Sequence, residues 1–217
     1  MKRKTRKVLA AVMVCLLAVT MLPSESLAFL HGSFVAKAAD SVNAAYSFNA
    51  DELDAAALAG GLDTAIAEDK TIGTDGYFTL MSMGGKVKIS KPGKLSCGIN
   101  DFQQCVYLTG GLKASGQAGI KVTVPEGKNA QVTIFASAKS TSESKLKYFD
   151  AAGTGVDIAG LEFENVQKYK VKNLGAGTYY FGGSNGAFVC FMEVKYTDVY
   201  TLDPNDASTF DAVFDGS

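Results

Sequence analysis

The sequence predicts an all-β fold, namely a jelly-roll β-sandwich of two antiparallel sheets with one short helical segment near the N-terminus. Three observations predict it. Apolar and polar residues alternate with period two along many short stretches, glycine-rich turns separate these stretches, and Val, Ile, Phe and Tyr dominate the apolar positions. Period two is the spacing of a half-buried strand, and short strands at regular intervals are typical of sandwiches. A parallel β-helix is less favoured because no repeat of about 20–30 residues is found.

The alternating stretches predict the following strands, in order along the chain. Phe78 and Leu80 alternate with polar neighbours, Gly84-Gly85 follows, and Val87 and Ile89 alternate with lysines, which predicts a hairpin. The later alternating stretches predict strands near 120–124, 132–136, 145–149, 168–172, 177–181 and 187–196. On the last of these, the alternation places Phe188, Cys190, Met192 and Val194 on one apolar face.

One stretch favours a helix instead. Asp51–Ala67 is rich in Ala and Leu, and Asp51-Glu52 suits a helix start. Gly60-Gly61 limits this helix to about two turns, because glycine disfavours a helix interior.

The two ends are predicted to lie outside the sandwich. Five basic residues among the first seven precede the apolar run Val8–Val19, which at twelve residues is too short for a membrane span of roughly 20. With the small-residue site Ala36-Lys37-Ala38, residues 1–38 are predicted to be a signal peptide of a bacterial protein that is secreted to the extracellular space without a membrane anchor. Residues 40–197 form the predicted module. Residues 198–217 form an acidic connector that is expected to lead to a further domain.

Charge and composition exclude several functions. Removal of residues 1–38 leaves 15 basic and 21 acidic residues, a net charge of −6, and every basic residue is Lys because the last Arg is Arg6. Nucleic-acid binding is therefore not expected. The single histidine, His31, lies in the predicted signal peptide, so the mature chain has no imidazole for a catalytic triad or a metal site.

Five stretches carry a resemblance to a known family. They are Gly73–Thr79 (GTDGYFT), Gly119–Pro125 (GIKVTVP), Ala130–Ile134 (AQVTI), Lys147–Gly153 (KYFDAAG) and Leu174–Gly182 (LGAGTYYFG). With them, residues 46–197 resemble accessory, carbohydrate-binding-like β-sandwich modules of secreted bacterial polysaccharide-degrading proteins, particularly pectate lyases. The resemblance implies a jelly-roll module that partners a plant cell-wall polysaccharide of the pectin kind, with a catalytic domain in the same polypeptide. No individual ligand position is carried over, because the mature chain has no Arg.

Candidate ligand-binding residues follow from the outward phase of the strands. They are Lys86, Lys88, Lys121, Lys145 and Lys147, with the aromatic residues Phe135, Phe191 and Tyr180. Lysines can bind the carboxylates of an acidic glycan, and an exposed ring can stack on a sugar. The alternative is an ordinary solvated sheet face for the lysines. For the aromatic rings it is a face covered by the partner sheet or by Asp51–Ala67.

Acidic residues and cysteines are considered for metal binding, hydrolysis and disulfide formation. Asp75 and Asp150 lie at turns and are the candidate ligands for a structural Ca²⁺. Glu162 and Glu164 are placed on one strand face, where two neighbouring acids are more typical of solvated surface than of a hydrolase pair. Three cysteines follow the signal peptide, and whether Cys97 and Cys105 form a disulfide is left open.

Two functions are therefore compared. The first is a non-catalytic module that binds an acidic plant cell-wall glycan. The second is a structural or adhesive surface module without a glycan ligand. The lack of histidine and of arginine in the mature chain disfavours an enzyme within this segment.

Overall fold

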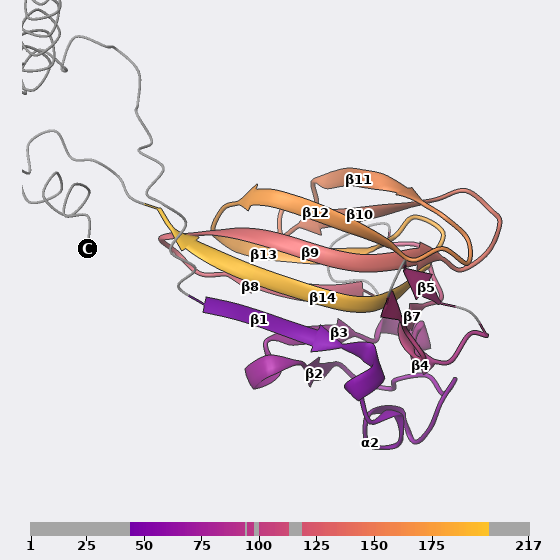
Figure 1. The fold of residues 1–217 in the computed structure, drawn as a ribbon. Helices are drawn as coiled ribbons and strands as arrows, with labels where there is room; N and C mark the ends of the chain where they lie inside the picture. The colour runs from indigo at the N-terminus through magenta and orange to yellow at the C-terminus, as the bar shows by residue number, and fades with distance from the viewer. Residues whose placement is uncertain (1–43, 94, 98–99, 113–118, 200–217) are drawn as a thin grey trace, which may run out of the picture. The chain divides into compact units, whose positions relative to one another are not determined.

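A computed structural model describes residues 44–93, 95–97, 100–112 and 119–199, which belong to one compact unit within Lys37–Thr201. The predicted signal peptide and nearly all of the predicted connector lie outside these residues. Within them the all-β sandwich of two antiparallel sheets is confirmed (Figure 1).

The sandwich has two six-stranded sheets, which we name sheet A and sheet B. Sheet A has the order β12 (Gln167–Leu174), β9 (Lys128–Ala138), β14 (Ala187–Asp198), β7 (Cys105–Leu108), β4 (Val87–Ser90), and β1 (Ala44–Asn49) also pairs with β14. Sheet B has the order β11 (Gly155–Leu161), β10 (Ser144–Asp150), β13 (Gly177–Gly183), β8 (Gly119–Val124), β3 (Phe78–Met81), β2 (Lys70–Ile72). The short strands β5 (Ser96–Cys97) and β6 (Asn100–Asp101) pair with each other.

The chain passes repeatedly between the two sheets. After β7, every connection except the one between β10 and β11 leads from one sheet to the other. The main core lies between the sheets and includes Phe78, Ile120, Ile134, Phe181 and Met192, each at most 2% exposed. Because alternate residues of each strand enter this core, the residues between them form two outer faces, one on each sheet.

The predicted helical segment is confirmed and is short. It consists of the 3₁₀ turn η2 (Ala50–Glu52) and the helix α2 (Ala55–Ala59). Asp54 begins α2 because its carboxylate accepts hydrogen bonds from the backbone N–H groups of Ala56 and Ala57. Gly60 ends it in the left-handed region, with φ of 76°, a conformation that glycine adopts without steric cost. No described helix has the length and hydropathy of a membrane-spanning segment.

The hairpin predicted around Gly84-Gly85 is wrong. β3 pairs with β2 and β8 in sheet B, whereas β4 pairs with β7 in sheet A, so the turn between them leads from one sheet to the other. Gly84 and Gly85 have φ values of 71° and 68°, in the short 3₁₀ segment η4 (Met83–Gly85). Two successive residues at positive φ suit a tight hairpin and a sheet-to-sheet corner equally well. The Gly-Gly pattern therefore predicts a turn but does not show with which strands β3 and β4 pair.

A β-bulge changes the phase of the last strand. The register between β14 and β9 shifts between Val189 and Phe191. Val189 and Met192 therefore face the main core, whereas Cys190 belongs to a second apolar cluster on the outer face of sheet A. The expectation that Cys190 shares a face with Met192 and Val194 is wrong, because the bulge inserts one residue into the alternation.

Candidate functional site

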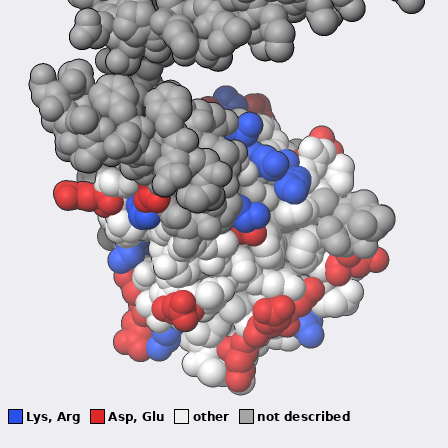
Figure 2. Space-filling view, turned by 60° about the vertical axis from the view of Figure 1, so that its left-hand side comes forward, with Lys and Arg blue, Asp and Glu red and all other residues white. Residues whose placement is uncertain are grey.

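The predicted ligand-binding residues are divided between opposite outer faces. Lys121, Lys145, Lys147 and Tyr180 lie on the outer face of sheet B. Lys88, Phe135 and Phe191 lie on that of sheet A, and Lys86 follows the turn η4 before β4. One ligand cannot contact both faces of a sandwich, so these residues belong to at least two separate surfaces. Figure 2 shows that the charges are unevenly spread, with a group of lysines in the upper part of that view and carboxylates gathered along the lower part.

A continuous row of residues crosses all six strands of sheet B. Successive partners in the ladders are Thr71 on β2, Thr79 on β3, Lys121 on β8, Tyr180 on β13, Phe149 on β10 and Gly155 on β11. We call these residues the transverse row. Neighbouring strands lie about 4.8 Å apart, so five spacings give the row a length of about 24 Å. The row is long enough for several sugar residues.

Lys121 and Tyr180 are the central pair of the transverse row. They are directly opposite in the ladder between β8 and β13, and both are partly exposed. Across the described part of the chain, Lys121 makes no ion pair and the ring of Tyr180 makes no stacking or cation–π contact. Within the described ranges, a lysine without an ion pair and a tyrosine without a ring contact therefore occupy neighbouring positions on this outer face.

Phe149 forms the floor of the row beside Tyr180. Its ring covers Gly155 on the neighbouring strand, and Lys147 Nζ lies 5.1 Å from the centroid of the ring. Although it projects from the outer face, Phe149 is only 8% exposed because of these two neighbours. Phe149 was not among the predicted ligand-binding residues. Its alternation with the inward-facing Tyr148 could have placed it on the outer face.

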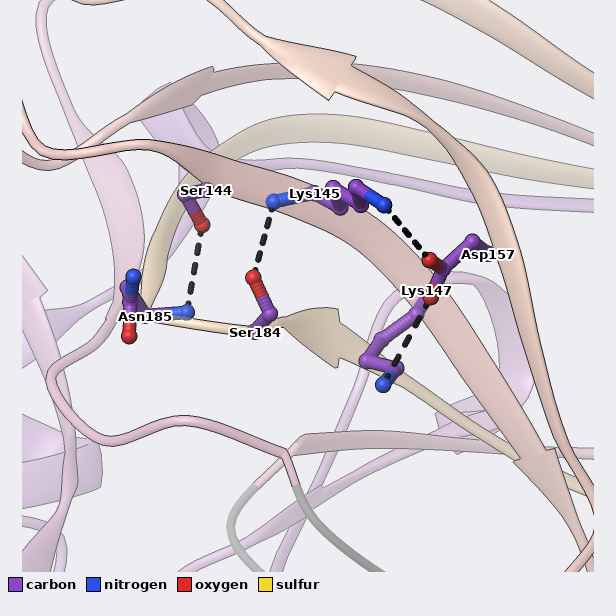
Figure 3. A network of polar contacts seen from close by, with 6 residues as sticks. All are labelled: Ser144, Lys145, Lys147, Asp157, Ser184 and Asn185. Atoms are coloured by element: carbon purple, nitrogen blue, oxygen red, sulfur yellow. Dashed lines mark hydrogen bonds and ion pairs between the residues drawn. The ribbon is translucent and has the colours of Figure 1, made fainter.

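Lys145 and Lys147 share one carboxylate at the end of this surface (Figure 3). Asp157 on β11 lies 3.1 Å from Lys145 Nζ and 3.5 Å from Lys147 Nζ. The hydrogen bond from Lys145 holds the pKa of the Asp157 carboxyl below its ordinary value, and the same bond raises the pKa of the Lys145 ammonium. The three side chains together carry a net charge of +1, with two ammonium groups already held by one acid.

Two serines fix the strand that carries these lysines. The backbone N–H of Lys145 donates to Ser184 Oγ at 2.9 Å, and the backbone N–H of Asn185 donates to Ser144 Oγ at 3.2 Å (Figure 3). These bonds join the start of β10 to the turn between β13 and β14. They therefore hold Lys145 and Lys147 in register with the strand that carries Tyr180.

The aromatic residues on sheet A pack against one another. The ring centroid of Phe135 lies 5.9 Å from that of Phe102 and 5.6 Å from that of Phe191. Lys168 Nζ lies 5.5 Å from the ring centroid of Phe135. Beneath them, Leu95, Cys105, Val166 and Cys190 form the second apolar cluster. The rings of this face are thus surrounded by side chains of the protein, unlike the ring of Tyr180.

The cover over this face comes from a different segment than the sequence analysis considered. Leu95 and Phe102 come from the described parts of the connection between β4 and β7, and Val166 comes from the connection between β11 and β12. Asp51 holds the first of these by accepting backbone hydrogen bonds from Gln103 at 2.9 Å and Gln104 at 2.6 Å. The Asp51–Ala67 segment therefore anchors the cover, and the two connections provide it.

The predicted calcium ligands belong to separate turns. Asp75 lies in the 3₁₀ turn η3 (Thr74–Gly76) before β3, and Asp150 ends β10, with β8 and β13 between these two strands. The carboxylate of Asp150 accepts the backbone N–H of Thr154 at 2.7 Å, as expected for a turn residue. Among the described residues, no group of three or more His, Cys, Asp or Glu is arranged to hold a metal ion. A bound Ca²⁺ stays a prediction.

Glu162 and Glu164 do not share a strand face as expected. Both follow the end of β11 at Leu161, and Glu164 has a φ of 59°, a left-handed conformation. The carboxylate of Glu162 accepts a hydrogen bond from Asn165 Nδ2 at 2.6 Å. The alternation of apolar and acidic residues here reflects a turn, in which Phe163 makes an isolated bridge to Ala138.

No protein-family model and no curated protein matches the chain. Among solved structures, the chain is similar to the CBM22-1 xylan-binding domain of Xyn10C from Paenibacillus barcinonensis, with 13% identity, a TM-score of 0.38 and coverage of 60% of this chain and 93% of that one. It is also similar to a carbohydrate-binding module of lichenase 5A from Cellvibrio mixtus in complex with cellotriose, with 11% identity, a TM-score of 0.29 and coverage of 51% and 86%. A third similar structure is TmCBM61 with bound β-1,4-galactotriose, at 15% identity, a TM-score of 0.28 and coverage of 54% and 81%. All three are carbohydrate-binding modules. The sandwich fold of this chain was described above from its own strand pairing.

Proposed function

We propose that this chain is a non-catalytic module that binds a glycan on the outer face of sheet B. The observation that carries the proposal is the pair formed by Lys121 and Tyr180. These residues are directly opposite in the ladder and have no other side-chain partner among the described residues. The ring supplies an apolar face for a pyranose, and the ammonium supplies a charge-assisted hydrogen bond.

The proposed ligand is an acidic polysaccharide whose repeating units carry carboxylates. Lys121 lies within the transverse row, and Lys145 and Lys147 lie beside it on the same face. A hydrogen bond to a charged group contributes about 1.5–3 kcal/mol, so two or three such contacts would give measurable binding. Attraction at this face is local, because charges beyond about 8–10 Å are screened at physiological ionic strength and the mature chain is predicted to be negative overall.

The kind of glycan and the partner domain are inferred from the family resemblance of the sequence. That resemblance favours a pectin-like plant cell-wall polysaccharide and a secreted, extracellular protein. It also favours a polysaccharide-degrading domain of the pectate lyase kind as a partner in the same polypeptide. The module would then hold the polymer close to that domain, and its own lack of an imidazole base after residue 38 is in keeping with binding without turnover.

Affinity electrophoresis tests this function. The purified protein is run through native gels with polygalacturonate, xylan or β-1,4-galactan, each with Ca²⁺ and with a chelator. We expect retardation by polygalacturonate that Tyr180→Ala abolishes. Phe191→Ala on sheet A serves as the matched control and should be retarded like the wild type. Unchanged mobility in all gels would support the rival function, a structural or adhesive module.

A further inference from the structure

Two cysteines from different strands meet in the second apolar cluster. Cys105 is the first residue of β7, and Cys190 lies in β14 at the bulge. The last pair in the ladder between these strands is Val106 with Val189. Cys105 and Cys190 are the next residues of these two antiparallel strands beyond that pair, and both belong to the second apolar cluster.

Both cysteines face the same side of sheet A. Val106 and Val189 point into the main core, whereas Cys105 and Cys190 are fully buried in the second cluster with Leu95. Neighbouring residues of antiparallel strands have Cα atoms about 4.5–5.5 Å apart when they are directly opposite. Disulfides require a Cα separation of about 4.4–6.8 Å, which adjacent strands can supply.

The surroundings of the pair determine when it can react. Burial raises the pKa of the Cys105 thiol above its ordinary value, and the neighbouring Cys190 raises it further. Thiol–disulfide exchange proceeds through the thiolate, which is scarce in such a site. Both cysteines are also completely buried, which keeps reagents away. Oxidation must therefore occur while the chain folds, before these side chains are buried.

We infer that Cys105 and Cys190 form a cross-strand disulfide when the chain folds in an oxidising environment, and that Cys97 remains a thiol. The oxidant is a disulfide, carried by a small molecule such as oxidised glutathione or by a protein. One cysteine thiolate attacks it and releases one thiol, and the second cysteine then attacks the mixed disulfide and releases the other. The two electrons and two protons lost by the cysteines end on the two released thiols.

This pairing differs from the Cys97–Cys105 pairing left open by the sequence. Cys97 belongs to β5, which pairs only with β6 among the described strands and shares no ladder with β7 or β14. Cys105 carries a free thiol in the structure, which is therefore the reduced form of that residue. Cys190, in contrast, follows the last ladder pair of β7 and β14 and is buried in the same cluster as Cys105. The proposal depends on the predicted export for its oxidising environment and is independent of glycan binding.

Peptide mapping tests the proposal. The protein without residues 1–38, which include Cys15, is reduced, unfolded and refolded with oxidised and reduced glutathione. It is then blocked with a maleimide and digested with trypsin and a protease that cleaves before Asp. Cleavage before Asp101 separates Cys97 from Cys105, so the expected product joins the peptide 101–113 to the peptide 173–195. The maleimide should label Cys97 alone.

Variants make the outcome decisive. Cys97→Ser should refold to a protein with no reactive thiol after denaturation, and its thermal midpoint should fall by several degrees on reduction. Cys190→Ser should show no such shift. A linkage from Cys97 to either other cysteine, or three labelled cysteines in the refolded protein, would overturn the proposal. Mapping of the wild-type protein decides the matter even if a variant fails to fold.

Discussion

The ring of Phe149 covers the backbone of Gly155 across the ladder between β10 and β11. A Cβ atom at position 155 would lie 2.6 Å from Cε1 of this ring, closer than real Cβ atoms approach a neighbour. The ring therefore needs a glycine beneath it to stay flat beside Tyr180. This contact links the stability of an edge strand to the shape of the proposed binding surface.

Gly155→Ala should destabilise the protein by about 1–3 kcal/mol, because the ring of Phe149 must move to make room for the methyl group. Urea denaturation measures the free energy of unfolding. Gly160→Ala on the same strand is the matched control, because a Cβ there has nothing within 4 Å. That variant should be neutral or slightly more stable, by up to about 1 kcal/mol. Equal effects at both positions would contradict the packing of Phe149 described here.

Asp157→Asn should strengthen the binding of an acidic glycan. The substitution removes the carboxylate that holds both Lys145 and Lys147, so both ammonium groups become available to the ligand. Exposed ion pairs are weak and screened by salt, so we expect a gain of about two- to fivefold in affinity at low salt, diminishing as salt is added. Glu193→Gln, which frees Lys195 on sheet A, is the control and should leave affinity unchanged. Weaker binding by Asp157→Asn would indicate that the carboxylate itself contacts the ligand.

Stability should fall at alkaline pH through a cluster of tyrosines between the sheets. The hydroxyls of Tyr77 and Tyr196 both donate to the carbonyl of Thr123, at 2.7 Å and 2.8 Å, and burial raises the pKa of both groups. A folded pKa above the unfolded value of about 10 means that the stabilisation is complete below pH 10 and is lost as the pH rises above it.

Tyr77→Phe should therefore reduce the loss of unfolding free energy between pH 8.5 and 11, although it lowers stability at pH 8.5 by about 1 kcal/mol through the lost hydrogen bond. Tyr196 keeps the carbonyl of Thr123 paired in this variant. Urea denaturation at a series of pH values provides the measurement. An alkaline slope identical to that of the wild type would show that Tyr77 ionises equally in the folded and unfolded chain.

Gln104 should control the opening of the cover over the second apolar cluster. Its side-chain amide donates to the carbonyls of Ala50 at 2.7 Å and Leu53 at 2.9 Å, and it is 6% exposed. Gln104→Ala leaves both carbonyls without this donor, at a cost of about 1–3 kcal/mol. Hydrogen exchange should accelerate in residues 95–105. The neighbouring Gln103→Ala, at an exposed position, is the control, and equal acceleration in both variants would contradict this role.

The strands and the helix could be predicted from sequence because their signals are local. The alternation of Ile120, Val122 and Val124 marks β8, and Asp54 with Gly60 bounds α2. The strands β1, β2, β7 and β11 were missed, as were the two-residue strands β5 and β6. They are short or rich in Ala and Gly, and their formation depends on their partner strands.

The candidate site could be predicted only in part. The outward phase of Lys121 and Tyr180 follows from alternation, but their placement opposite each other depends on the pairing of β8 with β13, which the sequence does not display. The same limit explains why Phe135 and Lys121 were grouped although they lie on opposite faces. The bulge before Phe191 changes the phase of one strand without any glycine to mark it.

Isothermal titration of polygalacturonate into two lysine variants tests the central claim most directly. Lys121 and Lys88 each lie opposite a tyrosine in mid-strand, Tyr180 on sheet B and Tyr107 on sheet A. The ring of Tyr107 packs on Phe188 at 4.7 Å, whereas that of Tyr180 stacks on no ring among the described residues. The account predicts that Lys121→Gln weakens binding about tenfold, equivalent to about 1.4 kcal/mol, and that Lys88→Gln has no effect. Equal affinities for both variants, or a loss confined to Lys88→Gln, would contradict it.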